Sequence, residues 1–296
     1  MSVPQTHPLP APKAGSFFVA VPYSNAKFGS VMPRFRPCGF IAPLVLAALL
    51  PLTAVAGEMP NRFVYLRDLD PTIRQDMRYA GAANFTGHRV PGYDAPECVL
   101  VREAADALHA VQTELAPHRL SLKVYDCYRP ARAVGAFVAW AKLPDDAQAK
   151  AIYYPALDKQ ALFPGYIATR SGHSRGATMD LTLVPLDAPA DAPASNEGAG
   201  ASCTAPRDQR MADTSLDMGT GFDCFDGKAN TVAPGLTDTQ RENRALLLDA
   251  MTRHGFKNYD KEWWHFTLEN EPNPDTIFDF PIEPLPARGT REKSKP

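Results

Sequence analysis

Two short polar segments, far apart in the chain, place the strongest constraint on its fold. One is Ser171–Asp180, which reads SGHSRGATMD, and the other is Glu262–His265, which reads EWWH. They supply His173, Asp180 and His265, and a catalytic zinc site uses three such ligands and leaves a fourth position for water. Because the ligands of one ion must converge, a fold that binds a metal here must bring the two segments together.

The second segment also contains a carboxylate, Glu262, that is not needed as a ligand. A free carboxylate beside a metal can take a proton from the metal's water, so the set predicts a zinc hydrolase of a small peptide. Iron and manganese accept the same ligand types. In a straight strand, residues three apart point to opposite faces, so Glu262 and His265 can meet only at a bend or bulge. We expect Trp263 and Trp264 to pack around that bend and exclude water.

The segment 178–184 has the alternation of a strand, with Asp180, Thr182 and Val184 on one face. A carboxylate on a strand that otherwise looks buried is costly unless it is paired or bound to a metal. The alternative is a carboxylate that accepts hydrogen bonds from the backbone of the preceding turn.

A second core strand is predicted at 120–127, followed by a helix at 131–143. Pro130 suits the first turn of that helix, where a missing N–H costs nothing. Arg129 therefore lies at a strand-to-helix junction, next to the positive end of a helix. A surface ion pair is the alternative role for this arginine.

The rest of the chain also mixes strand and helix patterns. The mixed order predicts an α+β fold over 57–285, with a small antiparallel sheet flanked by helices and the metal site on the sheet face. The last helix should begin at a capping box formed by Thr237 and Gln240. The further predicted elements are strands at 62–66, 76–79 and 258–268, helices at 99–116 and 237–254, and loops over 144–168.

Residues 1–56 are typical of an N-terminal extension followed by a secretion signal peptide. Arg34 and Arg36 precede the apolar run 39–56, which ends in small residues suited to cleavage. A membrane anchor is disfavoured, because the run contains two prolines and is barely long enough to span a bilayer of ~30 Å. We therefore expect an exported, periplasmic protein with no stable membrane insertion after cleavage. Either Met1 or Met32 is the true start.

Export would place the remaining cysteines in an oxidising compartment. Cys38 lies within the signal, and Cys98, Cys127, Cys203 and Cys224 remain. Four cysteines allow three pairings, of which we favour Cys98–Cys127 with Cys203–Cys224. A four-cysteine zinc site is the alternative, but the chain has no C-x-x-C spacing.

Net charge and composition indicate which classes of molecule the chain can bind and which of its segments lack regular structure. A net charge of -2 provides no electrostatic case for binding nucleic acid. The segment 187–213 is rich in Ala, Pro, Asp, Gly and Ser without periodicity, which predicts a flexible surface insert. Residues 286–296 are predicted to be a disordered tail.

Taken together, the motifs resemble the D-alanyl-D-alanine dipeptidases, a family that includes the enzyme of vancomycin-resistance operons. Its wider superfamily includes D-Ala-D-Ala carboxypeptidases, lysostaphin-type endopeptidases and the hedgehog amino-terminal domain. The likeness extends roughly from Leu66 to Pro281 and is specific in order and spacing. The segments that carry it are DMRY at 76–79, NFTG at 84–87, YDCYRP at 125–130, SGHSRG at 171–176 with DLTL at 180–183, MGTGFD at 218–223 and EWWH at 262–265.

The resemblance implies a role for each site residue. Arg129 would stabilise the oxyanion of the tetrahedral intermediate. Asp223 and Tyr79 would hold the substrate's ammonium group, and Ser171 would lie near the substrate's carboxylate. One Zn²⁺ per chain would be bound by His173, Asp180 and His265, with Glu262 as the general base. The implied substrate is a small D,D-dipeptide, D-Ala-D-Ala above all.

The signal peptide and the insert at 187–213 distinguish the chain from the familiar cytoplasmic members. Two alternatives therefore stay open. One is a peptidoglycan D,D- or L,D-carboxypeptidase or endopeptidase with the same zinc site. The other is a zinc-stabilised binding domain without activity, although such a domain needs neither Glu262 nor Arg129.

Overall fold

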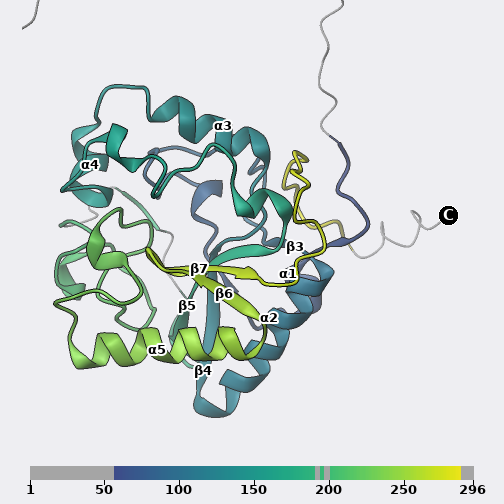
Figure 1. The fold of residues 1–296 in the computed structure, drawn as a ribbon. Coiled ribbons are helices and arrows are strands. Elements are labelled where there is room, and N and C mark those ends of the chain that lie inside the picture. Colours follow the sequence, from purple (N-terminus) through teal and green to yellow (C-terminus); the bar gives the residue numbers. More distant parts are fainter. Residues whose placement is uncertain (1–56, 191–193, 197–200, 288–296) are drawn as a thin grey trace, which may run out of the picture. The chain divides into compact units, whose positions relative to one another are not determined.

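The structure is a computed structural model that describes residues 57–190, 194–196 and 201–287 (Figure 1). The predicted extension and secretion signal at 1–56 lie outside these residues, as does most of the predicted tail at 286–296. Among the described residues, no helix combines the length and apolar character needed to cross a membrane.

A five-stranded sheet forms the centre of the fold, in the order β2-β4-β5-β7-β6. Neighbouring strands run antiparallel except at one edge, where β2 pairs with β4 in parallel. The predicted α+β class is confirmed, and the parallel edge strand makes the sheet mixed. The strands are β2 (Arg74–Gln75), β4 (Leu120–Asp126), β5 (Thr178–Pro185), β6 (Phe256–Tyr259) and β7 (Glu262–Leu268).

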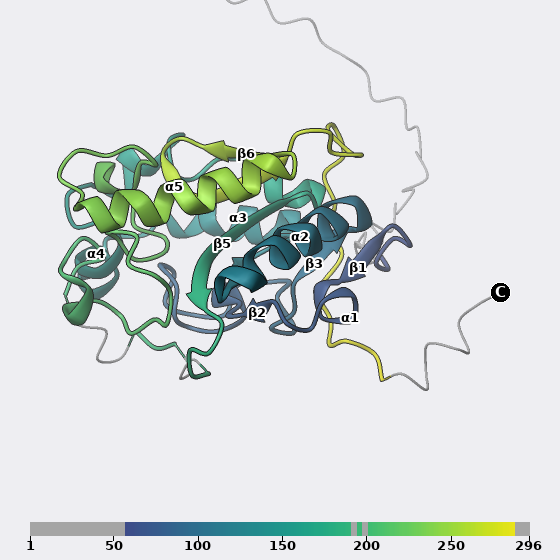
Figure 2. The same ribbon diagram turned by 90° about the horizontal axis from the view of Figure 1, so that it is seen from below.

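Helices cover both faces of this sheet. Figure 2 shows α2 and α5 side by side in front of β5, and both contact the central strands. α3 and α4 lie across the opposite face, together with long loops (Figure 1). The helices are α1 (Leu66–Leu69), α2 (Arg102–Leu115), α3 (Ala131–Trp140), α4 (Ala147–Tyr153) and α5 (Asp238–Arg253).

Local sequence explains where the two long helices lie and begin. The stripe of Ala104, Leu108, Val111 and Leu115 on α2 is buried, so its removal from water drives the packing of the helix on the sheet. α5 begins at the predicted capping box, in which Thr237 Oγ1 accepts from Gln240 N and Gln240 Oε1 accepts from Thr237 N.

Shorter elements complete the fold. β1 (Phe63–Tyr65) and β3 (Val99–Val101) form a separate two-stranded antiparallel sheet. Single turns of 3-10 helix occur at Arg78–Ala80, Ala116–His118, Lys159–Leu162, Gly172–Arg175, Arg207–Gln209 and Gly227–Ala229.

Tertiary contacts overrule two of the predicted boundaries. The predicted helix at 99–116 begins only at Arg102, because its first three residues pair with β1 as strand β3. The predicted strand at 76–79 is also wrong. Pairing with β4 ends at Gln75, and the amide of Asn84 then draws the chain into a tight turn by donating to three backbone carbonyls.

Two further predictions, the strand at 258–268 and the loops at 144–168, are wrong because a turn and a helix cap were overlooked. The segment 258–268 is a hairpin and not a single strand, with Asp260 and Lys261 between β6 and β7. The segment predicted as loops over 144–168 contains α4, whose N-terminus is capped by Asp146 through its bond from Ala149 N.

The described part of the insert at 187–213 is attached to the body of the fold. Asn196 donates to the carbonyls of Ala82 and Asn84, and Cys203 is buried in a disulfide with Cys224. A second disulfide joins Cys98 to Cys127, so both bridges follow the pairing favoured from the sequence. Whether the remaining insert is flexible stays a prediction.

Candidate metal centre and active site

The three predicted metal ligands converge on one point of the sheet face. His173 Nε2 lies 3.3 Å from His265 Nδ1, and Asp180 Oδ1 lies 3.4 Å from the former and 3.0 Å from the latter. Donors bound to one tetrahedral zinc at ~2.0–2.2 Å are about 3.3–3.5 Å apart. Two sides of the triangle have this length and the third is slightly shorter, so the three donor atoms are close enough to bind one metal ion.

Strand register explains why two of these ligands meet. Asp180 on β5 is the direct cross-strand partner of His265 on β7, and such partners lie on the same face of a sheet. His173 comes from the 3-10 helix just before β5. Gly176 makes the connection with φ of 84°, and a Cβ there would lie 2.2 Å from the Phe63 ring.

Backbone and carboxylate contacts orient the first imidazole. His173 Nδ1–H donates to the carbonyl of Cys127 at 2.8 Å, and Asp126 Oδ2 lies 3.4 Å from the same nitrogen. Because Nδ1 carries the proton, the lone pair of Nε2 is free for a metal. Partners of this kind hold the ring of a ligating histidine in place.

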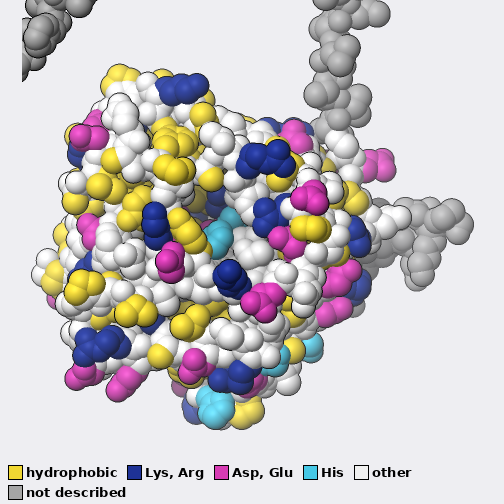
Figure 3. Space-filling model, in the orientation of Figure 1, with side chains coloured by type: hydrophobic (Ala, Val, Ile, Leu, Met, Phe, Trp, Pro, Cys, Tyr) yellow, Lys and Arg dark blue, Asp and Glu magenta, His cyan; other side chains and the backbone are white. Residues whose placement is uncertain are grey.

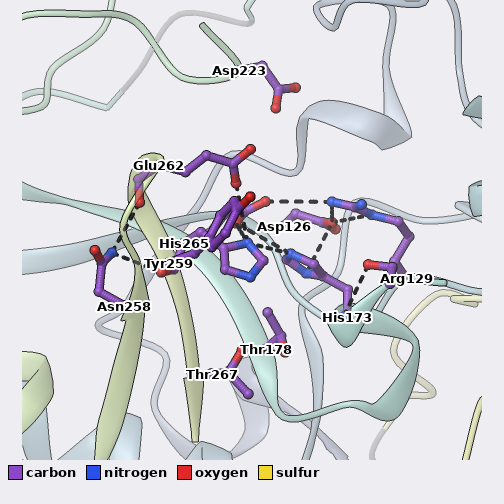
Figure 4. A network of polar contacts seen from close by, with 12 residues as sticks. Asp126, Arg129, His173, Thr178, Asp223, Asn258, Tyr259, Glu262, His265 and Thr267 are labelled. Carbon is purple, nitrogen blue, oxygen red and sulfur yellow. Dashed lines mark hydrogen bonds and ion pairs between the residues drawn. The ribbon is translucent and has the colours of Figure 1, made fainter. Parts of the chain in front are cut away.

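The bend predicted near the tryptophans is present as a bulge in β7. Asn258 pairs with Phe266, but the next residue, Tyr259, pairs with Glu262. Asn258 Nδ2 donates to the carbonyls of Glu262 and His265 at 3.1 and 3.0 Å, which satisfies two backbone groups of the bulge (Figure 4). As a result, Glu262 Oε2 lies 3.5 Å from His265 Nδ1.

The two tryptophans lie within the bulged part of β7, and their rings contact each other. Trp263 and Trp264 are buried, with their rings 5.2 Å apart and nearly perpendicular. Trp263 Nε1 donates to Thr220 Oγ1, and Trp264 lines the cavity beside the ligands. Their packing fits the predicted structural role.

Burial sets the charges of the site. It raises the pKa of Glu262 well above its ordinary value, with added repulsion from Asp180 and Asp223. It also lowers the pKa of His265, which favours the neutral, ligating imidazole. Burial opposes the charge of Asp180 too, but its contacts with His173 and His265 outweigh this and lower its pKa.

Arg129 is held beside the ligands by a residue that the sequence analysis missed, Asp126. The Nε and Nη2 atoms of Arg129 donate to Asp126 Oδ2 at 2.9 and 2.8 Å, and Nη2 lies 3.6 Å from Asp180 Oδ2. Asp126 is fully buried and also accepts from Tyr93 Oη at 2.7 Å. Burial alone lowers the pKa of Arg129, but the carboxylates, Asp126 foremost, raise it well above its ordinary value.

Asp223 and Tyr79 form a second buried polar pair in the same cavity. Tyr79 Oη donates to Asp223 Oδ2 at 2.9 Å, and the guanidinium of Arg129 lies 5.1 Å from the centre of the Tyr79 ring. Burial, and then repulsion from Asp180, raises the pKa of Asp223 to about 8. Asp223 is therefore a buried carboxyl in need of a cationic partner.

These groups line a cavity of ≈ 310 Å³. Figure 3 shows a hollow on this face with a histidine side chain at its bottom. Ser171 lies in the wall, where its Oγ accepts from His173 N at 3.3 Å and caps the 3-10 helix. Its predicted contact with a substrate stays a prediction. All eight predicted metal, catalytic and substrate residues are thus in one cavity: Tyr79, Arg129, Ser171, His173, Asp180, Asp223, Glu262 and His265.

Comparison with known proteins identifies the family. The model of a peptidase family described as D-Ala-D-Ala dipeptidase matches residues 59–192 and 190–283. A D-alanyl-D-alanine dipeptidase of Streptomyces coelicolor is 38% identical over 225 residues, which is 76% of this chain and 100% of that protein. One of Enterococcus faecalis is 35% identical with the same coverage, and one of Escherichia coli is 29% identical over 70% of this chain and 85% of that protein. The chain belongs to the D-Ala-D-Ala dipeptidase family. It is a metallopeptidase whose His/Asp/His group could hold the metal.

Sequence reasoning missed three residues of this dipeptidase site: Asp126, Asn258 and Tyr259. Asp126 lies within a predicted core strand, so the argument that singled out Asp180 as a costly buried carboxylate could have found it. Asn258 supports the β7 bulge by donating to the carbonyl of His265. Tyr259 Oη donates to the carbonyl of Gly165 in the cavity wall. No sequence pattern signals either role.

Proposed function

We propose that the chain is an exported zinc dipeptidase that hydrolyses D-alanyl-D-alanine to two molecules of D-alanine. The observation that carries this proposal is the content of one small cavity. It holds a three-donor metal triangle, an unused carboxylate on Glu262, a buried cation on Arg129 and a buried carboxyl on Asp223. The relatives named D-alanyl-D-alanine dipeptidase supply the substrate.

The donor set favours zinc, with one ion per chain. Two imidazole nitrogens and one carboxylate oxygen within 3.0–3.4 Å of one another suit a tetrahedral site with one position left for water. Zinc, when bound, polarises a carbonyl and lowers the pKa of its water to about 7.

Two residues carry the remaining chemistry. Glu262 takes a proton from the attacking water while the new C–O bond forms, and gives that proton to the leaving nitrogen as the peptide C–N bond breaks. Arg129 donates to the carbonyl oxygen as it becomes negative, and a donor of this kind contributes roughly 3–4 kcal/mol to lowering the barrier. Asp126 holds that donor in place.

The charges of the cavity suit a free dipeptide, which carries an ammonium and a carboxylate group. Asp223 with Tyr79 binds the ammonium, because a buried carboxyl gains most from a cationic partner. Arg129 and Arg170 are the cationic side chains among the described residues that line the cavity, and Arg129 is already paired. The exposed Arg170, next to Ser171 in the chain, is therefore the residue proposed to meet the carboxylate.

The test is a parallel assay of purified, zinc-loaded enzyme on D-Ala-D-Ala and on purified muropeptides. Mass spectrometry should detect free D-alanine from the dipeptide, while the muropeptides stay intact. Glu262→Gln should lose about 10²-fold or more in kcat and keep its zinc. A chelator should abolish activity and added zinc restore it. No turnover of D-Ala-D-Ala by the zinc-loaded enzyme refutes the proposal, and release of D-alanine from muropeptides favours a carboxypeptidase instead.

Export to the periplasm is part of the proposal and rests on the apolar run at 39–56 and on the even number of cysteines after it. N-terminal sequencing of the exported protein tests it. A mature chain that begins well before Gly57 counts against this part.

A further inference from the structure

Cys203 of the insert at 187–213 contacts the chain on both sides of Asp223. Its N–H donates to the carbonyl of Ile152 at 2.8 Å, and its carbonyl accepts from Gly221 N at 2.9 Å. Its side chain forms the disulfide with Cys224, and the residue is 5% exposed. The insert is therefore bonded to Gly221 and Cys224, which flank Asp223 in the chain.

Asp223 precedes Cys224 directly and needs external support for its position. Its φ of 55° lies in the left-handed region, which is unfavourable for a residue other than glycine. Its carboxyl group is also buried near other acidic groups. Conformations of this kind persist only where the surrounding structure holds them.

Noncovalent contacts and one covalent link provide that support. Tyr79 Oη donates to the carboxyl of Asp223, and the N–H of Phe225 donates to the carbonyl of Tyr153 at 2.8 Å. The covalent link is the Cys203–Cys224 bridge, one residue away from Asp223. A covalent link so close to the carboxyl group limits how far the loop can move away from the cavity.

We propose that the Cys203–Cys224 disulfide is a positioning device for Asp223, so that selectivity for a free substrate ammonium group depends on this bridge. The inference rests on the proposed dipeptidase function. It assigns a purpose to the insert, because the insert supplies one of the two cysteines. The family model matches the chain in two pieces that meet at residues 190–192, within this insert.

The other disulfide provides a matched comparison, because it adjoins the opposite end of the site. Cys127 lies between Asp126 and Arg129, and its carbonyl accepts from His173 Nδ1. Removing Cys98–Cys127 should therefore disturb the metal ligand and the oxyanion donor, with loss of zinc affinity and kcat. Removing Cys203–Cys224 should leave zinc content unchanged and act on binding of the ammonium.

The experiment compares wild-type enzyme with the double variant Cys203→Ser, Cys224→Ser on D-Ala-D-Ala and on N-acetyl-D-Ala-D-Ala, which lacks the ammonium. Serine variants replace reduction, because thiol reductants bind zinc. We expect kcat/KM for the free dipeptide to fall about tenfold, mostly through KM, because small misplacements of binding groups have effects of this order. The acetylated dipeptide is measured as a competitive inhibitor of D-Ala-D-Ala hydrolysis, and its inhibition constant should change less than about twofold. The ratio of this inhibition constant to the KM of the free dipeptide therefore falls.

The ratio separates positioning from a loss of folded enzyme, because a smaller amount of active enzyme changes neither KM nor the inhibition constant. If the serine variant does not fold, Cys203→Ala with Cys224→Val restores apolar volume and serves instead. Asp223→Asn should lower the ratio as well, and adding the disulfide variant to it should lower the ratio no further. An unchanged ratio in a folded disulfide variant overturns the inference alone. A wild-type enzyme that does not cleave D-Ala-D-Ala overturns the proposed function and the inference together.

Discussion

Replacement of Asp126 by asparagine tests how Arg129, the proposed oxyanion donor, is held. The wild-type carboxylate accepts two bonds from Arg129, at 2.9 and 2.8 Å, and one from Tyr93 Oη at 2.7 Å. Asparagine keeps the shape of the side chain but removes its charge, and its NH₂ group cannot accept a bond. Arg129 then stays buried without its nearest anionic partner.

The expected losses follow from these contacts. Breaking a buried ion pair costs about 3–5 kcal/mol, and we expect the lower end because Asp180 Oδ2 remains 3.6 Å from Arg129. A misplaced oxyanion donor should lower kcat by about 10²-fold. KM should change little, because Asp223 and Tyr79 are separate from this pair. Zinc affinity should fall by no more than about tenfold, since Asp126 is a weaker partner of His173 than Cys127 is.

The measurements are steady-state kinetics on D-Ala-D-Ala, urea unfolding and zinc content, all on the full chain. Tyr93→Phe is the matched control, because it removes one donor to Asp126 and leaves the carboxylate in place. Its kcat should fall less than about tenfold. If Asp126→Asn lost stability but kept kcat within about threefold of wild type, Asp126 would only stabilise the fold and the reasoning about Arg129 would be wrong.

Three further predictions address other parts of the structure. Arg170→Met should raise KM for D-Ala-D-Ala about tenfold by removing a charged hydrogen-bond donor, with no effect on D-Ala-D-Ala amide; equal effects on both compounds would exclude a contact with the carboxylate. Gly176→Ala should lower the free energy of unfolding in urea by more than ~1 kcal/mol, because its Cβ would lie 2.2 Å from the Phe63 ring. Gly135→Ala is the control, because a Cβ at that position meets nothing within 4 Å. Burial raises the pKa of Asp213, but Lys123 and Arg78 outweigh this and hold it well below its ordinary value. The stability that this pairing contributes is therefore full above the unfolded pKa of about 3.9 and is lost as pH falls toward the folded pKa. The gap in unfolding free energy between wild type and Asp213→Asn should shrink below about pH 4, and a gap independent of pH would contradict the assignment.

The candidate metal ligands were predictable because their chemistry is local to the residue type. Two histidines and an aspartate can bind a divalent ion wherever they meet, and the length of a strand or the hydrogen bond of a capping box depends on near neighbours in the chain. This is why β4, β5 and the start of α5 match the predictions. Asp126 is a buried carboxylate on a predicted core strand, as Asp180 is, so residue chemistry alone also indicates a polar partner for it.

Other features depend on contacts between segments that are distant in the chain. β3 is a strand because β1 pairs with it, although its residues also fit a helix pattern. The β7 bulge exists because the side chain of Asn258 on the neighbouring strand satisfies its carbonyl groups. No alternation of residues along one segment contains that information.

Residue chemistry alone predicted a set of donors suited to zinc with one further carboxylate, in a mixed fold of strands and helices. The tertiary structure then decided how the side chains of this set are arranged. Cross-strand register placed Asp180 opposite His265, and the bulge turned Glu262 toward them. The disulfide Cys203–Cys224 links the insert to the residue that follows Asp223. The physical reason for the division is that ligand chemistry belongs to single side chains, whereas distances between them depend on the pairing of remote backbone segments.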